Sequence, residues 1–325
     1  MFAEAIEDIL RDECTPARVR DIEAGGSSAA LWQALAGAGF LELLTPEPHG
    51  GAGLALQELF PILTHFGRYA APVPMAQAIA ARALVAPGTT LRDGMLTLAP
   101  ALTRGAGGEL RCPLVPFGAI AQHVLAADGD RLLLFACADA QRLPTGIENS
   151  QLATLLWPND RSAEHISGDA TALAPLAAAL HAALLAGAML RVFEMTLQYC
   201  NERSQFGKSL GKFQAVQHQL SVMAEQVVAA SIAAEAAFQS TDRTPRFLPA
   251  AIAKARTSEA APGVANTAHA LHGAIGVTEE YDLQLLTRRL HEWRIAHGAE
   301  SYWNRLIGEQ VLAGSSTLAE FVRAG

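Results

Sequence analysis

The residues best suited to bind a ligand lie in one segment, ERSQFGKSLGKFQAVQ, at positions 202–217. Arg203, Lys208 and Lys212 surround Gly207 and Gly211 there, and a helical pattern follows. Guanidinium and ammonium groups bind anions, and glycine lets backbone N–H groups approach a phosphate closely. The segment therefore predicts an anion-binding loop at the start of a helix.

The tetrapeptide FGKS at 206–209 resembles the end of the P-loop of nucleoside triphosphatases. That motif, GxxxxGK[ST], requires glycine five residues before Gly207, where this chain has Glu202. A carboxylate at that position would repel a phosphate. A P-loop also follows a strand, whereas a helical pattern precedes this segment, so the sequence disfavours a nucleoside triphosphatase.

The composition narrows the class of protein. The chain has 325 residues, half of them apolar, and a net charge of −8. This is a globular protein without the basic surface that binding to nucleic acid requires. The four cysteines, Cys14, Cys112, Cys137 and Cys200, are widely spaced, which predicts neither a metal site nor a disulfide framework. Their spacing favours the reducing cytoplasm.

One stretch, Ala172–Leu190, carries no charge and is nearly long enough to cross a bilayer. It is mostly alanine, which adds little membrane-transfer energy. We therefore expect a buried core helix and no membrane span. The N-terminal MFAEAIEDIL is acidic and lacks the layout of a signal peptide.

The elements that would hold the loop fall into three predicted domains. Residues 1–93 form an N-terminal helical domain that is interrupted at TPEPHGGAG (residues 45–53), where prolines and glycines forbid a regular helix. Residues 94–168 contain short apolar runs broken by Gly, Pro and Asp, and the DGD at 128–130 indicates a hairpin. The predicted fold is mainly α, with a trimmed β domain in the middle.

Residues 169–325 form the third predicted domain, a four-helix bundle. After Phe213, apolar residues recur every three or four positions, which predicts one long helix. Further helices are expected from about residue 250 to 272, around Leu283–Leu290, and from about Ser301.

This order of segments resembles the acyl-CoA dehydrogenase family, and four stretches carry the resemblance. LLTPEPHGGAG is similar to its PExxGGxG turn, and ERSQFGKSLGKFQAVQHQLSVMA to its RxxFG…FQxxxH signature. LHGAIGVTEEYDLQLLTRRL resembles its GGxGxxxEY stretch, and AHGAESYWNRLIG falls at its final active-site turn. The resemblance implies an N-terminal helical domain, a β-barrel-like domain and a C-terminal helix bundle.

The family resemblance also implies FAD, which takes a hydride from Cβ of an acyl-CoA while a carboxylate removes the α-proton. Electron transfer to an electron-transferring flavoprotein is a further expectation. Six residues are expected to bind the cofactor, with Arg203 reaching its pyrophosphate across a subunit interface. They are Arg203, Gln205, Phe206, Gln214, Gly273 and Gly276. The alternative for Arg203 is an ordinary ion pair with Glu194 or Glu202.

Three departures from the family pattern concern catalysis and the flavin ring. His297 occupies the position of the usual catalytic glutamate, and no catalytic residue is predicted with confidence. A minority of the family places the base near Ala177, with an arginine at the position of Ala178, but no acid lies between residues 170 and 191. The TEPxxGSD-like strand motif is absent. Glu300 is a weak candidate for a displaced base.

The pattern resembles the heterotetrameric acyl-CoA dehydrogenases of bacterial steroid degradation, which combine two unlike chains. The leading hypothesis is a subunit that lends cofactor-binding residues to a partner carrying the base. One alternative is a self-sufficient enzyme with His297 as base, and a homo-oligomer is the alternative to the heterotetramer. The other is a structural or regulatory paralogue that binds no flavin.

Overall fold

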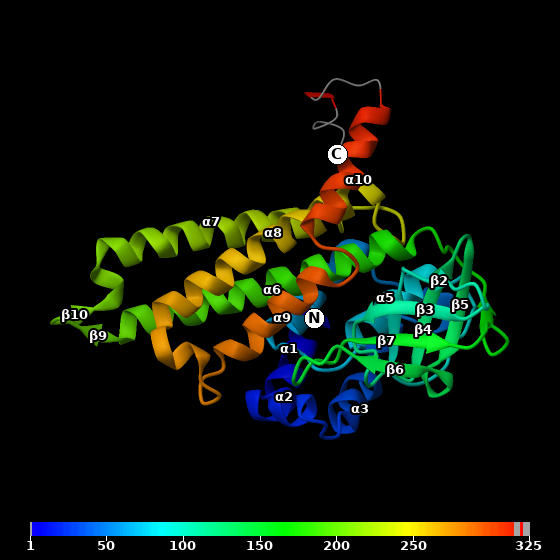
Figure 1. Cartoon of the computed structure of the whole chain (residues 1–325), viewed down its shortest axis with the longest axis horizontal. Helices are drawn as coiled ribbons and strands as arrows, with labels where there is room; N and C mark the ends of the chain where they lie inside the picture. The colour runs from blue at the N-terminus through cyan, green and yellow to red at the C-terminus, as the bar shows by residue number, and fades with distance from the viewer. Residues whose placement is uncertain (1, 315–318, 321–325) are drawn as a thin grey trace.

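The computed structural model of the chain describes residues 2–314 and 319–320. Helices form the first and last parts of the described chain, and strands form the middle (Figure 1). The prediction of a mainly α fold with a small middle β module is confirmed.

The N-terminal helices pack beside the long helices of the C-terminal part (Figure 1). Helix α4 follows the predicted break, and Pro61 lies inside this helix. The expected break at residues 45–53 is a short 3-10 turn followed by glycines. The elements are α1 (Phe2–Glu13), α2 (Pro16–Glu23), α3 (Ala29–Gly37), η1 (Phe40–Glu42), η2 (Glu47–His49), α4 (Leu56–Arg68) and α5 (Met75–Leu84).

Two four-stranded sheets make up the β module. One has the order β1-β4-β5-β8, with β1 and β4 parallel, and the other has the order β2-β3-β7-β6. The hairpin at residues 128–130 joins β4 to β5, with Asp128 opposite Arg131. The elements are β1 (Leu96–Ala99), β2 (Thr103–Arg104), β3 (Leu110–Val115), β4 (His123–Asp128), β5 (Arg131–Ala136), η3 (Cys137–Asp139), β6 (Gln141–Pro144), β7 (Ala153–Trp157) and β8 (Glu164–Ile166).

Long helices and one tight hairpin make up the C-terminal part. The helices α6, α7, α8 and α9 pack against one another, and the hairpin of β9 and β10 connects α6 to α7 at one end of the molecule (Figure 1). The elements are α6 (Leu173–Glu202), β9 (Ser204–Gln205), β10 (Lys208–Ser209), η4 (Leu210–Lys212), α7 (Gln214–Ala236), α8 (Phe247–His272), η5 (Gly273–Val277), α9 (Leu283–Ile295) and α10 (Glu300–Ala313).

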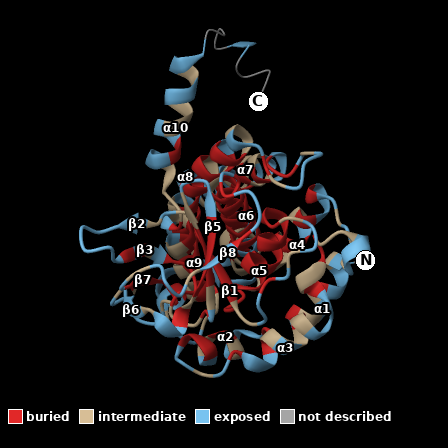
Figure 2. Ribbon diagram, turned by 90° about the vertical axis from the view of Figure 1, so that its right-hand side faces the viewer, coloured by how far each residue is buried: buried red, intermediate tan, exposed pale blue. Residues whose placement is uncertain are grey.

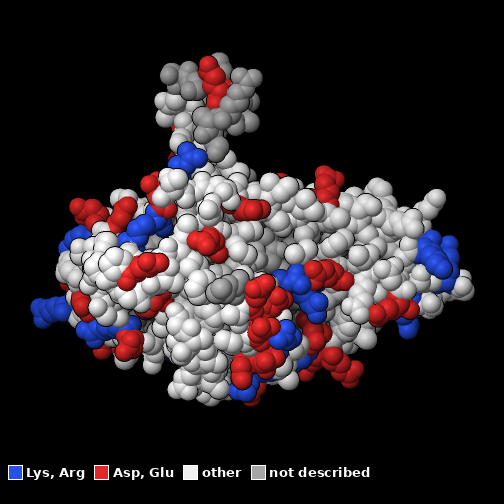
Figure 3. Space-filling view, turned by 180° about the vertical axis from the view of Figure 1, so that it is seen from behind, with Lys and Arg blue, Asp and Glu red and all other residues white. Residues whose placement is uncertain are grey.

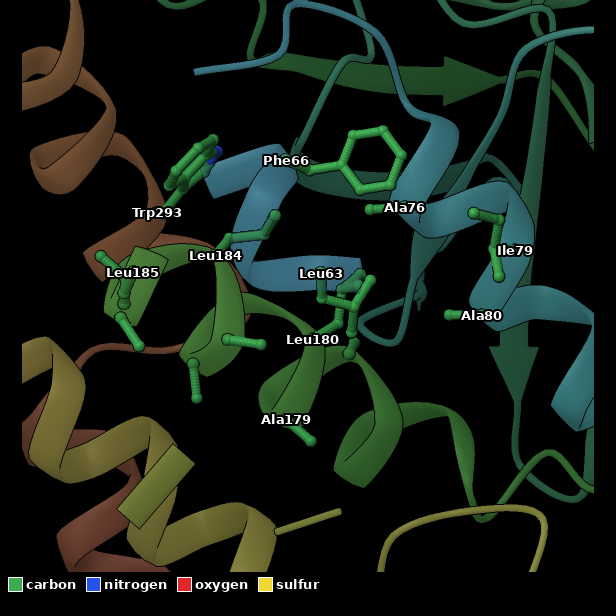
Figure 4. Close-up of a cluster of buried hydrophobic side chains, with 14 of the residues drawn as sticks. Leu63, Phe66, Ala76, Ile79, Ala80, Ala179, Leu180, Leu184, Leu185 and Trp293 are labelled. Carbon is green, nitrogen blue, oxygen red and sulfur yellow. The ribbon is translucent and has the colours of Figure 1, made fainter. Parts of the chain in front are cut away.

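Helix α6 is the centre of the core. In the most apolar 18-residue stretch of this helix, 89% of the residues are buried inside the protein. The stretch at residues 172–190 therefore packs as the expected core helix. Leu180 and Leu184 of α6 meet Leu63 and Phe66 of α4 in the cluster of Figure 4.

Two glycines bring α4 and α6 into backbone contact. A Cβ atom at Gly67 would lie 2.1 Å from the carbonyl oxygen of Leu184, and one at Gly187 would lie 2.0 Å from that of Thr64. Any side chain at either position would push the helices apart, since real Cβ atoms do not approach so closely. The contact therefore fixes the N-terminal helices against the bundle.

Helix α10 leaves the body of the molecule. It projects outward, and Trp303 near its start is the buried residue of the helix (Figure 2). Leu306, Ile307 and Val311 lie on the same face as Trp303 and are half-buried. The apolar pattern predicted this helix, but not that it would extend away from the bundle.

Candidate functional site

The predicted anion-binding loop is a tight hairpin at the end of α6. Ser204–Gln205 pairs with Lys208–Ser209, and Phe206 and Gly207 form the two-residue turn with φ of +51° and +81°. Two positive φ values in succession define a type I′ turn, which normally selects Asn or Gly. The hairpin geometry differs from a P-loop, so the structure agrees with the rejection of that motif.

Phe206 is strained and exposed at once. Its left-handed backbone disfavours a bulky side chain, and the residue is 90% exposed. A strained backbone that presents a large apolar side chain to solvent is a feature of binding surfaces. Within its own chain, the Phe206 ring meets the edge of the Phe213 ring, with 6.3 Å between the ring centroids.

Arg203 caps the C-terminus of α6 and is exposed. Its predicted alternative partners are engaged elsewhere. Glu194 binds Arg68 through two hydrogen bonds of 2.9 Å, and Glu202 accepts a hydrogen bond of 2.8 Å from Gln198. Within the described chain, the Arg203 guanidinium has no carboxylate within 4.0 Å.

A cavity of about 580 Å³ lies between this end of α6 and the end of α8. Three of the six predicted cofactor residues line it: Arg203, Gln205 and Gly273. Gly273 ends α8 with φ of +64°, a conformation that favours glycine. The lining residues are Tyr199, Arg203, Gln205, Leu210, Val216, Ala270, Leu271, His272, Gly273, Ala274 and Ile275.

The other three predicted cofactor residues do not line this cavity. Phe206 lies at the turn of the hairpin, and Gln214 is exposed at the start of α7. Gly276 is buried, and a Cβ atom there would lie 2.9 Å from the Cβ of His272. Gly276 therefore serves the packing of the turn, while Phe206 and Gln214 face solvent.

Aromatic rings support the wall of the cavity. The ring of His272 stacks on Tyr199 at 4.5 Å, and its Nε2 lies 3.3 Å from the hydroxyl of Tyr281. Nδ1 of His272 donates to the carbonyl of Ala268, and burial lowers the pKa of this histidine. His272 is therefore a packed histidine with a partner for each ring nitrogen.

The second candidate region is the turn between α9 and α10, which carries His297. This residue has φ of +57° and borders a cavity of about 320 Å³ between the turn and the β module. The cavity wall is apolar apart from His297 and the polar atoms of Tyr302 and Trp303. On the side of the β module, Ala99, Pro100 and Leu114 line the cavity.

A second histidine packs against the ring of His297. His181 of α6 is fully buried, and its ring lies 4.7 Å from the ring of His297 in an edge-to-face contact. Burial lowers the pKa of His181 to about 3. Burial, followed by the charges of His181 and Lys254, holds the pKa of His297 well below its ordinary value. Both imidazoles are neutral at physiological pH.

Lys254 of α8 donates hydrogen bonds to backbone carbonyls of the same turn. Its buried ammonium lies 2.8 Å from the carbonyl oxygen of Arg294, 3.0 Å from that of Gly298 and 2.8 Å from Oγ of Ser258. These bonds fix the backbone on both sides of His297. Burial lowers the pKa of Lys254 to about 7.

Glu300 does not face a reacting atom as a free base would. Its carboxylate binds the guanidinium of Arg294 through two hydrogen bonds, one of 2.9 Å from Nε. The bond from Arg294 lowers the pKa of Glu300. The geometry makes this carboxylate an ion-pair partner at the start of α10.

The sequence interpretation missed Lys254 and treated His181 only as a residue of an apolar stretch. A histidine in the otherwise uncharged stretch at residues 172–190 was the one available signal for the pair. Ala177 and Ala178, at the alternative base position of the family, are fully buried, and the carbonyl of Ala177 accepts a hydrogen bond from His181. In the described residues, no three His, Cys, Asp or Glu side chains are grouped to hold a metal ion.

The hairpin of β9 and β10 lies at one end of the molecule, whereas the α9–α10 turn lies away from it, beside the β module (Figure 1). His181 and Arg203 are 22 residues apart on one continuous helix, so α6 separates them by about 33 Å. Figure 3 shows Lys and Arg atoms gathered at the end where Figure 1 places β9 and β10. The anion-binding end and the His297 end of one chain are therefore separate sites.

Comparisons with known proteins match the two helical parts of the chain to one family. Residues 1–92 match the acyl-CoA dehydrogenase N-terminal domain, and residues 171–312 match the acyl-CoA dehydrogenase C-terminal domain. Acyl-CoA dehydrogenase IpdE2 of Mycolicibacterium smegmatis is 31% identical over 90% of this chain and 91% of its own length. FadE34 of Mycobacterium tuberculosis is 32% identical over 92% of this chain and 45% of its own.

Solved structures share the fold. The Tcur3481-Tcur3483 steroid ACAD variant has a TM-score of 0.80 at 27% identity, covering 97% of this chain and 98% of the other. The ChsE4-ChsE5 complex of Mycobacterium tuberculosis has a TM-score of 0.81 at 22% identity and covers 97% of each chain. The chain belongs to the acyl-CoA dehydrogenase family of flavoprotein oxidoreductases that act on acyl-CoA.

Proposed function

We propose that this chain is a subunit of an FAD-dependent acyl-CoA dehydrogenase and completes a flavin site held mainly by an unlike partner chain. The observation that carries the proposal is the pairing of a solvent-facing Arg203 with a strained, exposed Phe206 at one end of the molecule. Within the described chain, the Arg203 guanidinium pairs with no carboxylate, and the Phe206 ring meets the edge of the Phe213 ring at 6.3 Å while the residue stays 90% exposed. Both are therefore available to a ligand bound by a neighbour.

The residues at this end fit the pyrophosphate part of FAD. A guanidinium without a carboxylate partner can donate paired hydrogen bonds to a diphosphate. Gln205 adds a neutral amide, and Gly273 leaves the backbone of its turn open to close approach. FAD, when bound, supplies the hydride acceptor for α,β-desaturation of the acyl-CoA. This chain would bind and orient the cofactor's charged half.

The His297 end argues against a self-sufficient enzyme. A base that removes an α-proton becomes positively charged, and the surroundings of His297 oppose that charge. The ring is enclosed, lies near Lys254, and has its pKa lowered by both effects. Proton abstraction is therefore assigned to a carboxylate of the partner.

The outward face of α7 supports an assembly with another chain. Val222, Val228 and Ile232 are exposed on this helix, which starts directly after the hairpin. An apolar surface beside unpartnered cofactor residues is a suitable docking surface for a protein that holds the rest of the flavin. Names of the similar structures refer to two-chain complexes and to a steroid ACAD.

Three further assignments rest on family likeness. We propose a heterotetramer, a steroid-derived or fatty acyl-CoA substrate, and electron transfer to an electron-transferring flavoprotein. A cytoplasmic location agrees with four buried cysteines that are all free thiols. The division into domains at residues 93 and 168 also stays a proposal.

The test is flavin content per chain, measured for the chain alone and co-purified with a candidate partner from an adjacent gene. We expect little flavin and no acyl-CoA oxidation from the chain alone, and both from the complex. Stoichiometric flavin and turnover in the isolated chain would establish the self-sufficient alternative. A complex in which Arg203→Ala leaves the flavin content unchanged would favour the paralogue that binds no flavin.

A further inference from the structure

Another cavity lies where the N-terminal helices meet the C-terminal bundle. It measures about 240 Å³, and its walls come from the end of α1, the start of α2, the end of α4, the middle of α6 and the start of α9. It shares no lining residue with the cavity at the hairpin or with the cavity at the α9–α10 turn. It is therefore separate from both candidate regions.

Three arginines supply the positive charge of this cavity. Arg11, Arg68 and Arg191 line it together with Tyr69. Burial, followed by the charge of Glu7, raises the pKa of the Tyr69 hydroxyl, and the three arginines act on that pKa in the opposite direction. The three guanidiniums therefore lie around one phenolic hydroxyl.

Arg191 has hydrogen-bond donors that its own chain leaves unused. Its ion-pair partner among the described residues is Glu194, at 3.7 Å, which is too long for a hydrogen bond. Glu194 already accepts two hydrogen bonds of 2.9 Å from Arg68. Two guanidiniums thus share one carboxylate, which leaves one positive charge in excess. The Tyr69 hydroxyl likewise has no hydrogen-bond partner within the described chain.

The other charges at the cavity have partners of their own. Asp282 is the one carboxylate among the lining residues, and Arg20 binds it at 2.6 Å. Arg11 pairs with Asp8 and Asp12, and these three side chains are at least 60% exposed. Neither of these two aspartates lines the cavity, and water screens exposed charges. The cavity therefore fits a ligand that carries a single negative charge.

The rest of the lining is largely apolar, and the cavity is large enough for a ring. The apolar side chains include Cys14, Val19, Met195, Leu285 and Leu286. An apolar cavity of about 150 Å³ accommodates benzene, so about 240 Å³ leaves room for a ring and a carboxylate. Burying such a ring against this wall is favourable, because apolar surface leaves water.

We propose that this cavity binds a small organic carboxylate. The anionic group accepts hydrogen bonds from Arg191 and from the Tyr69 hydroxyl, and a ring or short chain packs on the apolar wall. A guanidinium suits this role because it donates paired hydrogen bonds to a carboxylate. The ligand contacts helices of both the N-terminal part and the bundle, so its binding stabilises the folded chain. The site does not depend on the proposed function, since it contains no residue of the hairpin.

Calorimetry on the full-length chain, with its partner if co-purification requires one, tests the class of ligand. The probes are phenylacetate, the uncharged phenylacetamide of nearly the same shape, and inorganic phosphate. We expect saturable binding of phenylacetate, about tenfold or more tighter than either of the other probes, since only phenylacetate combines a carboxylate with a ring. No binding of phenylacetate, or equal affinity for phenylacetamide or for phosphate, would overturn the proposal.

Two conservative variants test the position of the ligand. Arg191→Met should weaken phenylacetate binding about 10-fold or more, and Tyr69→Phe about 3-fold to 10-fold. Both variants should keep the unfolding midpoint of the ligand-free chain, because neither removes a hydrogen bond within the described residues. The control Arg161→Met, at an exposed arginine of the β module, should bind phenylacetate like the wild type. Unchanged affinity in Arg191→Met and Tyr69→Phe would place the ligand elsewhere and refute the assignment.

Discussion

The two ends of α6 are built in opposite ways. At its C-terminal end, Arg203 and Phe206 face solvent, and within the described chain the Phe206 ring only meets the edge of the Phe213 ring. Toward its N-terminal end, His181, His297 and Lys254 are enclosed and held by one another or by backbone carbonyls. Under the proposed function, the outer end serves a contact with another molecule, whereas the inner end fixes the shape of a turn. Substitutions at the two ends should therefore affect different properties.

The largest effect on stability is expected at a buried ion pair between α9 and α2. Arg289 and Glu23 have side chains that are 3% and 2% exposed, and their ion pair of 2.8 Å joins α9 to α2. Arg289 also donates to Gln151 of the β module. We expect Arg289→Met to lower the free energy of unfolding by about 3 kcal/mol, because Glu23 then keeps only the partly exposed Arg288 as its ion-pair partner.

Urea unfolding measures that loss, with Arg305→Met as the control. Arg305 pairs with Glu309 at 57% exposure on both sides, so its loss should cost at most about 0.5 kcal/mol. Similar losses of unfolding free energy in the two variants would mean that the buried ion pair does not join α2, α9 and the β module.

The next effect belongs to the outer end. Arg203→Ala should weaken flavin retention by the complex about 10-fold to 100-fold, since one or two charge-assisted hydrogen bonds are lost. Its unfolding midpoint should not change, because the side chain has no partner inside the chain. Absorbance of bound flavin and thermal unfolding of the same samples separate the two properties. A destabilised variant with normal flavin content would reverse the comparison.

The stability that Lys254 contributes at the inner end of α6 should depend on pH. The pKa of Lys254 is about 7 in the folded chain, below its ordinary value of 10.5, so the unfolded chain binds more protons between those values. Stability that depends on Lys254 should therefore rise with pH from about 7 to 8.5, by at most about 1.4 kcal/mol per pH unit.

Lys254→Met should remove this slope, and the exposed control Lys212→Met should keep it. The histidines do not interfere, because the lowered pKa values of His181 and His297 place their titration below this window. The measurement is the difference in unfolding free energy between variant and wild type at several pH values. An identical slope in Lys254→Met would refute the assignment.

The smallest effect concerns the strained turn. Phe206→Asn places a residue suited to positive φ at the first position of the type I′ turn, so the isolated chain should gain about 0.5–1 kcal/mol of stability. The same substitution should weaken flavin retention or partner binding. A gain in stability without any loss of binding would show that Phe206 is not part of the outer contact.

Much of the fold could be predicted because local signals and the tertiary structure agree. The periodicity after Phe213 marks α7, and DGD marks the β4–β5 hairpin. The strands β6, β7 and β8 were not identified individually, because their pairing depends on contacts between distant residues. The projection of α10 also has no local signal, since an apolar stripe does not tell which surface will cover it.

The two candidate regions also differ in how well the sequence predicts them. The motif around Arg203 led to the residues of the outer cavity, because a contiguous signature encodes a hairpin and a helix start. The inner cluster joins His181, Lys254 and His297 from three separate elements. Only the packing of α6, α8 and the α9–α10 turn reveals it.

The backbone contact of α4 with α6 through Gly67 and Gly187 has a consequence for assembly. A helix braced in this way acts as a rigid spacer, so the interval between its two ends is set by residue count. Inserting one turn of four residues after His181 would move the hairpin outward by about 6 Å and rotate it by roughly 40°. A partner that fits the hairpin is therefore matched to the length of a single helix.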